Sequence, residues 1–118
     1  MAKKKNSVNV NSVIAETNLI GTGDKVVLDL SLNTKFRLKL TRYTTLSEPI
    51  NRKKTSIGSI TIVQDSNFPM KLLFDPCYIF AGGLTPDLTN RVNAIDVLHF
   101  ICKPDGRVEC NLVKDLKE

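Results

Sequence analysis

Strict alternation of apolar and polar residues from Lys35 to Thr41 is the feature that most limits what this chain can fold into. Successive side chains of a strand point to opposite faces, so three apolar residues would share one face and three cations the other. Residues 59–64 alternate in the same way. No stretch of ten or more residues has the 3.6-residue period of an amphipathic helix. The sequence therefore predicts an all-β fold.

The C-terminal third predicts a β-hairpin. Residues 94–102 form a run that is apolar on both faces, and residues 107–113 return as its partner. Between them, Lys103-Pro104-Asp105-Gly106 places proline, aspartate and glycine at the second, third and fourth positions of a type I turn. A bulge at the glycine would place Cys102 opposite Val108.

The remaining segments predict short strands separated by turns. Residues 25–32 are expected to form a first core strand, residues 42–57 an exposed loop, and Asp75-Pro76 a bulge or corner, because proline cannot donate to a strand ladder. These elements favour an antiparallel β-sandwich or jelly-roll-like barrel. We expect one such domain over residues 21–118, preceded by an extended basic arm over residues 1–20.

Positive charge is concentrated in the first half of the chain. The net charge is +5, and residues 1–60 hold 11 Lys/Arg against 4 Asp/Glu. We predict that this half binds a partner through two sets of residues, one in the arm and one on the first alternating strand. The arm residues are Lys3, Lys4, Lys5, Val8 and Val10, and the strand residues are Lys35, Arg37 and Lys39.

The sequence predicts no catalytic, cofactor-binding or metal-binding residues. The single histidine, His99, follows Asp96 by three positions, so in a strand the two side chains lie on opposite faces and cannot form a relay. Three cysteines without C-x-x-C spacing argue against a zinc site and against a disulfide framework, and we expect them to be reduced and buried. No apolar run is long enough to span a bilayer, and no secretion signal is present. We therefore expect a protein that is not an enzyme.

From residue 24 to residue 113 the order of segments resembles a β-domain found in structural proteins of tailed bacteriophages. The matching segments are residues 28–31, 36–41, 58–65, 80–89 and 93–100. Related domains carry a tryptophan before the paired glycines, where this chain has Phe80. The resemblance implies a virion building block, commonly trimeric, without catalytic residues.

These expectations together favour a capsid decoration or cement protein, made in the cytoplasm of the bacterial host and located in the virion. Its partner would be another virion protein, with the major capsid protein favoured, and copies of the chain would form a homotrimer. The alternative is a tail-fibre subunit or receptor-binding knob that contacts the host surface. A third reading, a nucleic-acid-binding barrel of OB type, is weaker because few aromatic residues accompany the cations.

Overall fold

The computed structural model describes residues 16–19, 24–53 and 55–117, and in this part of the chain strands dominate. The strands form one six-stranded sheet, in the order β1-β3-β5-β8-β9-β7, and one three-stranded sheet, β2-β4-β6. A 3-10 turn, η3 (Ala81–Gly83), follows β7. The strand bounds are β1 Thr17–Asn18, β2 Lys25–Val26, β3 Lys35–Lys39, β4 Thr44–Leu46, β5 Ile57–Val63, β6 Leu72–Phe74, β7 Tyr78–Phe80, β8 Ile95–Cys102 and β9 Val108–Val113. The prediction of a β-rich fold is confirmed.

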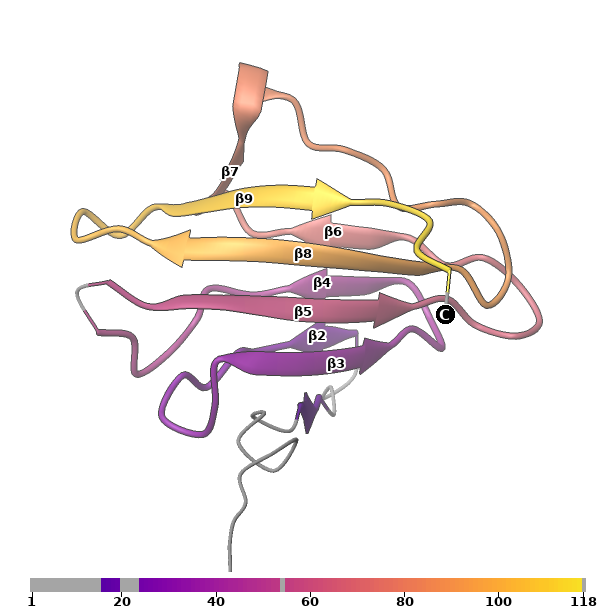
Figure 1. The fold of residues 1–118 in the computed structure, drawn as a ribbon, viewed down its shortest axis with the longest axis horizontal. Helices are drawn as coiled ribbons and strands as arrows, with labels where there is room; N and C mark the ends of the chain where they lie inside the picture. The colour runs from indigo at the N-terminus through magenta and orange to yellow at the C-terminus, as the bar shows by residue number, and fades with distance from the viewer. Residues whose placement is uncertain (1–15, 20–23, 54, 118) are drawn as a thin grey trace, which may run out of the picture.

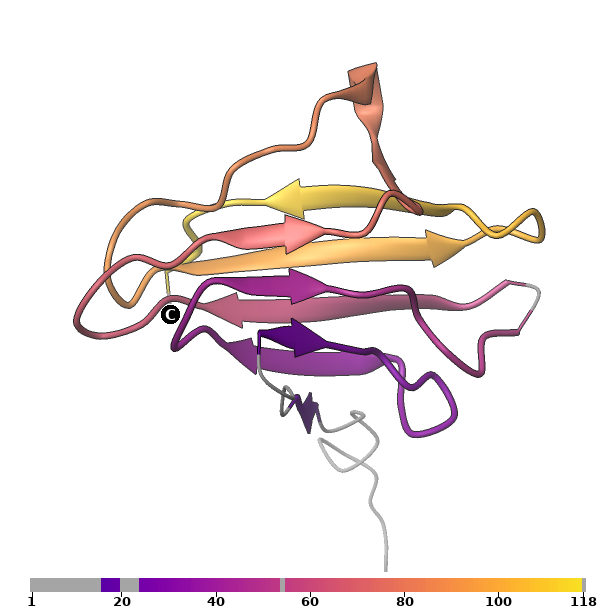
Figure 2. The same cartoon turned by 180° about the vertical axis from the view of Figure 1, so that it is seen from behind.

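The two sheets lie one behind the other, and the chain passes between them at almost every turn (Figures 1 and 2). From β1 to β7, successive strands belong alternately to the six-stranded and the three-stranded sheet. Each return to a sheet therefore adds a strand in the original direction, because the strand of the other sheet serves as the crossover. Of the seven strand pairs described, five are parallel, so the prediction of an antiparallel fold is wrong for most of the molecule.

Two local predictions also need correction. The segment predicted as an exposed loop, residues 42–57, contains β4, whose Thr44 and Leu46 are buried. The first core strand is only two residues long as a ladder, although Leu28 and Leu30 beyond it are buried. In both cases tertiary burial decided the outcome, because strands of two or three residues are too short to give a periodic pattern.

The C-terminal hairpin is confirmed. β8 and β9 pair antiparallel, with Cys102 opposite Val108. The Gly106 N–H donates to the Lys103 carbonyl at 3.1 Å, and Gly106 has a φ of 95°, a conformation that favours glycine. The predicted corner at Asp75-Pro76 is also confirmed, because the chain passes there from β6 in one sheet to β7 in the other.

One core joins the facing sides of the two sheets. Buried residues of the six-stranded sheet, such as Phe36 and Leu98, pack in the same cluster as Leu46 of the three-stranded sheet. Gly58 lies in β5 at a point of close approach: a β-carbon there would be 2.2 Å from the Thr34 carbonyl oxygen. Only glycine fits this position without a shift of the backbone.

Candidate functional site

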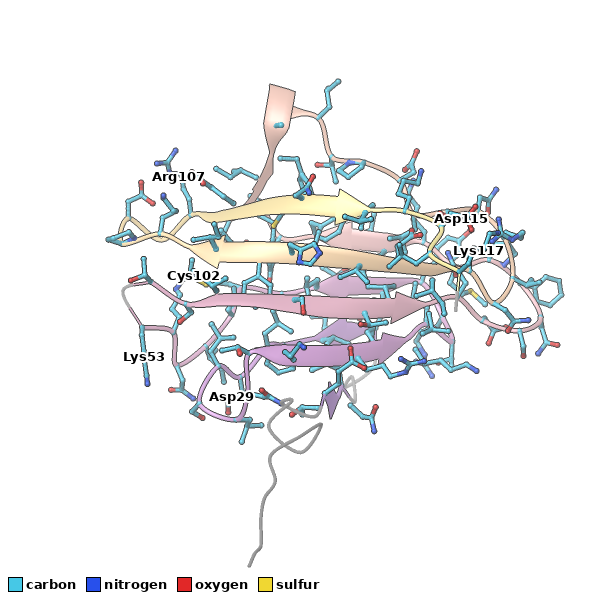
Figure 3. The ribbon with its side chains drawn as sticks, viewed as in Figure 1. Asp29, Lys53, Cys102, Arg107, Asp115 and Lys117 are labelled. Carbon is cyan, nitrogen blue, oxygen red and sulfur yellow. The ribbon has the colours of Figure 1, made fainter. Side chains whose placement is uncertain are left out.

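The outer face of the six-stranded sheet carries three of the residues that the sequence marked for partner binding, Lys35, Arg37 and Lys39. This face turns toward the viewer in Figures 1 and 3, with the three-stranded sheet behind it. On β8, Asp96 is buried and His99 is exposed, so the prediction that these two side chains lie on opposite faces is confirmed. His99 is paired across the sheet with Ser59 and Asn111. Neither neighbour is an acid or a base that could form a relay with the imidazole.

The basic residues of β3 lie on this outer face, as predicted from their alternation with Phe36 and Leu38. Arg37 is not a free cation, because its Nη1 lies 3.5 Å from Oε1 of Glu16. The Thr61 hydroxyl also donates a hydrogen bond to Glu16. Lys35, Arg37 and Lys39 together are called the basic strip. Its net positive charge depends mainly on Lys35 and Lys39.

Lys39 acts electrostatically on a neighbouring turn. The pKa of Asp65 is held below its usual value, first by hydrogen bonds from the backbone N–H groups of Asn67 and Phe68 and further by the positive charge of Lys39. Asp65 is only partly buried, so solvent screens this attraction. The lysine remains available to an acidic partner.

The arm enters the fold beside this basic strip. β1 pairs with β3, with Thr17 opposite Phe36 and Asn18 opposite Arg37, although the sequence predicts both β1 residues to belong to the arm. The predicted arm contacts at Lys3, Lys4, Lys5, Val8 and Val10 lie outside the described residues. The chain that follows them is nevertheless anchored at the edge of the sheet where the β3 cations lie.

Two shallow depressions cross the same outer face, nearer its other edge. The larger, about 330 Å³, is lined by side chains of β5, β8 and β9, among them Ile57, Ile101 and His99. The smaller, about 280 Å³, lies between β9 and β7. Both are bordered by Glu109, so they lie side by side across the strands, and together they are called the trough below. Ile57 is 66% exposed, which leaves an apolar surface uncovered.

The three cysteines gather around one buried phenol. Cys77, Cys102 and Cys110 all raise the pKa of Tyr78, although its burial is the larger cause. Burial also raises the pKa of the Cys77 and Cys110 thiols to about 12. Thiols with such values are protonated near neutral pH and are weak nucleophiles. Cys102 is fully buried, whereas the other two are half-buried, so the expectation of three buried cysteines holds fully for Cys102 alone.

Charged side chains at the ends of the sheet pair locally. Arg107 and Asp115 lie at opposite ends of β9 (Figure 3). Arg107 forms an ion pair with Asp105 at 2.7 Å, and Asp115 pairs with Arg91 and Lys117. Within residues 16–19, 24–53 and 55–117, no group of three or more His, Cys, Asp or Glu side chains could hold a metal ion. The same part of the chain contains no helix with the length and apolar character needed to cross a membrane.

Comparison with known proteins adds no relative: no protein-family model matches the chain, and neither a curated protein nor a solved structure matches it. The functional argument therefore rests on the residues of this chain.

Several features of the site were not found by sequence reasoning. Glu16 compensates Arg37 from 21 positions away, and no local pattern indicates such a pairing. The sequence predicts Ile57 in a loop, whereas it begins β5 and borders the trough. Glu109 follows the hairpin turn closely, and its sequence position gives no sign of a role on the sheet face. Leu84, an exposed residue just after η3, could have been found from the sequence. It lies between two glycines and a proline, residues that are typical of turns.

Proposed function

We propose that this chain is a structural subunit of a tailed-phage particle, most specifically a decoration protein that binds the capsid surface as a homotrimer and catalyses no reaction. Its attachment surface is the β1–β3 edge of the six-stranded sheet together with the arm. The main partner is the major capsid protein, and the mature location is the virion.

The observation that carries this proposal is the pairing of β1 with β3. It places the end of the basic arm directly against the strand that carries Lys35 and Lys39. Residues 17 and 18, which belong to the predicted arm, thus lie beside the strand that carries these cations. Such a surface suits an acidic partner that offers an extended segment or a sheet edge.

We also propose that the two sheets be classified as a β-sandwich. This is supported by the single core, to which both sheets contribute buried side chains. The parallel pairs set this sandwich apart from the antiparallel arrangement of most sandwiches. Enzymes usually hold their substrates in a concave pocket, whereas the hollows on this outer face are shallow, which supports a structural role.

Particle binding by purified variants tests the attachment surface. Wild-type protein, a variant lacking residues 2–12, and the double variant Lys35→Gln/Lys39→Gln would each be added to particles that lack the protein. We expect both variants to occupy fewer sites at subsaturating concentration, with the deletion weaker because it also removes backbone hydrogen bonds from any added strand. The lysine variant should show a smaller dependence on salt, since fewer charges contribute.

The control removes equal charge from the other sheet. Lys25 and Lys71 are exposed, in β2 and immediately before β6, respectively. Lys25→Gln/Lys71→Gln should bind particles like the wild type. If the two double variants lost the same fraction of particle binding, net charge rather than the β3 surface would drive binding. The proposed attachment surface would then be wrong.

A receptor-binding knob or fibre tip remains the second candidate, favoured by the exposed apolar tip after β7. Leu84 in this tip is 79% exposed. Copy number in purified particles separates the two functions: hundreds of copies indicate decoration, whereas a few dozen or fewer indicate the tail.

A further inference from the structure

Two apolar features of the surface are left without a cover. One is a tongue formed by residues 80–84, which stands away from the edge of the sheet above β9 (Figures 1 and 2). The other is the trough on the outer face of the six-stranded sheet, bordered by Ile57 and Ile101. The first projects and the second is hollow, and each exposes aliphatic side chains to water.

The tongue is held at its base and free at its tip. The Phe80 ring packs edge-on against Phe74, with ring centroids 5.1 Å apart, which fixes where the tongue leaves the sheet. Gly82 and Gly83 have φ values of 76° and 74°, so they form a left-handed turn. A β-carbon on either glycine would meet no heavy atom within 4 Å. Leu84, at 79% exposure, is therefore displayed on a defined support.

The trough offers apolar surface and enough room for an aliphatic side chain. Its larger part has a volume of about 330 Å³, several times that of one leucine side chain, and Ile57 and Ile101 are 66% and 38% exposed beside it. The acid on its border, Glu109, is already paired with Lys103 at 3.8 Å. Burying an aliphatic side chain here would therefore remove apolar surface from water without stranding an unpaired charge.

We propose that the tongue of one copy of this chain docks in the trough of a second copy, with Leu84 over Ile57 and Ile101. This inference rests on the homo-oligomer of the proposed function and names the surfaces that build it. Donor and acceptor are different parts of the molecule, so the contact is heterologous. Repeated head-to-tail contacts of this kind close into a ring, such as a trimer, when the rotation between copies permits.

Charge favours this occupant over an unrelated apolar segment. The acid nearest the tip is Asp87, three residues after Leu84 and exposed. On the receiving face, Lys35 is aligned with Ser59, two residues from Ile57 along β5. Three residues of extended chain reach about 10 Å, so Asp87 of the donor can approach Lys35 of the acceptor. A tongue this small covers less than the roughly 800 Å² per partner of a standard interface, so ring closure, which gives each copy two contacts, stabilises the assembly.

Sedimentation velocity on the full chain, from 1 to about 100 µM, tests the contact. Leu84→Asp damages the donor and leaves the trough intact, whereas Ile57→Asp damages the trough and leaves the tongue intact. We expect each variant to associate at least tenfold more weakly than the wild type. Leu32→Asp is the matched control, because Leu32 is 68% exposed but lies in another loop, and it should associate like the wild type.

The decisive sample is an equal mixture of the two damaged proteins. Each mixed pair keeps one intact tongue and one intact trough but cannot close a ring, so at the highest concentration the mixture should contain more dimer than either variant alone. Far-UV circular dichroism confirms folding, and Ile101→Asp replaces Ile57→Asp if the latter does not fold. A monomeric wild type, variants that associate like the wild type, or a mixture that associates no more than either variant alone would each overturn the proposal. Because Lys35 also belongs to the proposed attachment surface, the capsid role is judged from the wild type: a wild type that self-associates but does not bind particles would contradict only the capsid role.

Discussion

Replacement of Asp96 by asparagine should destabilise this fold strongly, although it changes only one polar atom of the side chain. Asp96 is 2% exposed on the inner face of β8. Its Oδ2 accepts the Thr89 N–H at 2.7 Å, and its Oδ1 accepts the Thr89 hydroxyl at 2.7 Å and the Asp115 N–H at 2.8 Å. One carboxylate thus ties together β8, the segment after the tongue and the chain after β9.

The expected magnitude follows from these three donors. An asparagine has one acceptor oxygen, so its best orientation keeps the two bonds of Oδ1 and turns its NH₂ group toward the Thr89 N–H. The loss of one hydrogen bond to a charged group costs about 1.5–3 kcal/mol, and the other two bonds lose their ionic character. We expect a total loss of about 3 kcal/mol, which is a large part of the stability of a typical domain.

Urea unfolding followed by far-UV circular dichroism measures this loss, since the chain contains no tryptophan for fluorescence. With a slope of about 1.5 kcal/mol per molar urea, the midpoint should fall by about 2 M. Asp24→Asn, at an exposed position, removes the same charge and should leave the midpoint nearly unchanged. A midpoint for Asp96→Asn equal to that of the wild type would refute the reasoning, because the three donors would then be satisfied without the carboxylate.

The core and the hairpin support three further predictions. Gly58→Ala should lower the free energy of unfolding by roughly 1–3 kcal/mol or more in the same urea assay, because its β-carbon would lie 2.2 Å from the Thr34 oxygen and 2.5 Å from the Phe100 ring; an unchanged midpoint would contradict this close approach. Burial raises the pKa of Cys110 to about 12, so the stability that its protonated thiol contributes is fully present below about pH 9 and is lost as the pH rises toward 12. Cys110→Ser should therefore reduce the loss of unfolding free energy between pH 9 and pH 12. A wild-type unfolding free energy that stays constant over this pH range would contradict the prediction. Gly106→Ala should destabilise the hairpin, since Gly106 has a φ of 95°, whereas Asp105→Gly should not force this strain; hydrogen exchange of β9 amides reports the difference.

Sequence reasoning located much of the candidate site but not its surroundings. The alternation of β3 identified Lys35, Arg37 and Lys39 as residues of one outer face, because side-chain direction in a strand depends only on the parity of position. It could not show that Glu16 neutralises Arg37 or that β1 anchors the arm beside them. Those contacts join segments that are far apart in sequence, and no local sequence pattern indicates that such segments will pair.

For the C-terminal hairpin, local chemistry was enough to determine both strands, the turn and the register. It also determined that Asp96 and His99 point to opposite faces of the sheet. Only the tertiary structure decided which sheet each strand joins, and therefore that most pairs are parallel. A period-two pattern indicates that one side of a strand is buried. The pattern does not depend on whether the strand pairs with the next strand in sequence or with the one after it. The choice depends on one core shared by two sheets, and the same packing left Ile57 and Leu84 exposed to water.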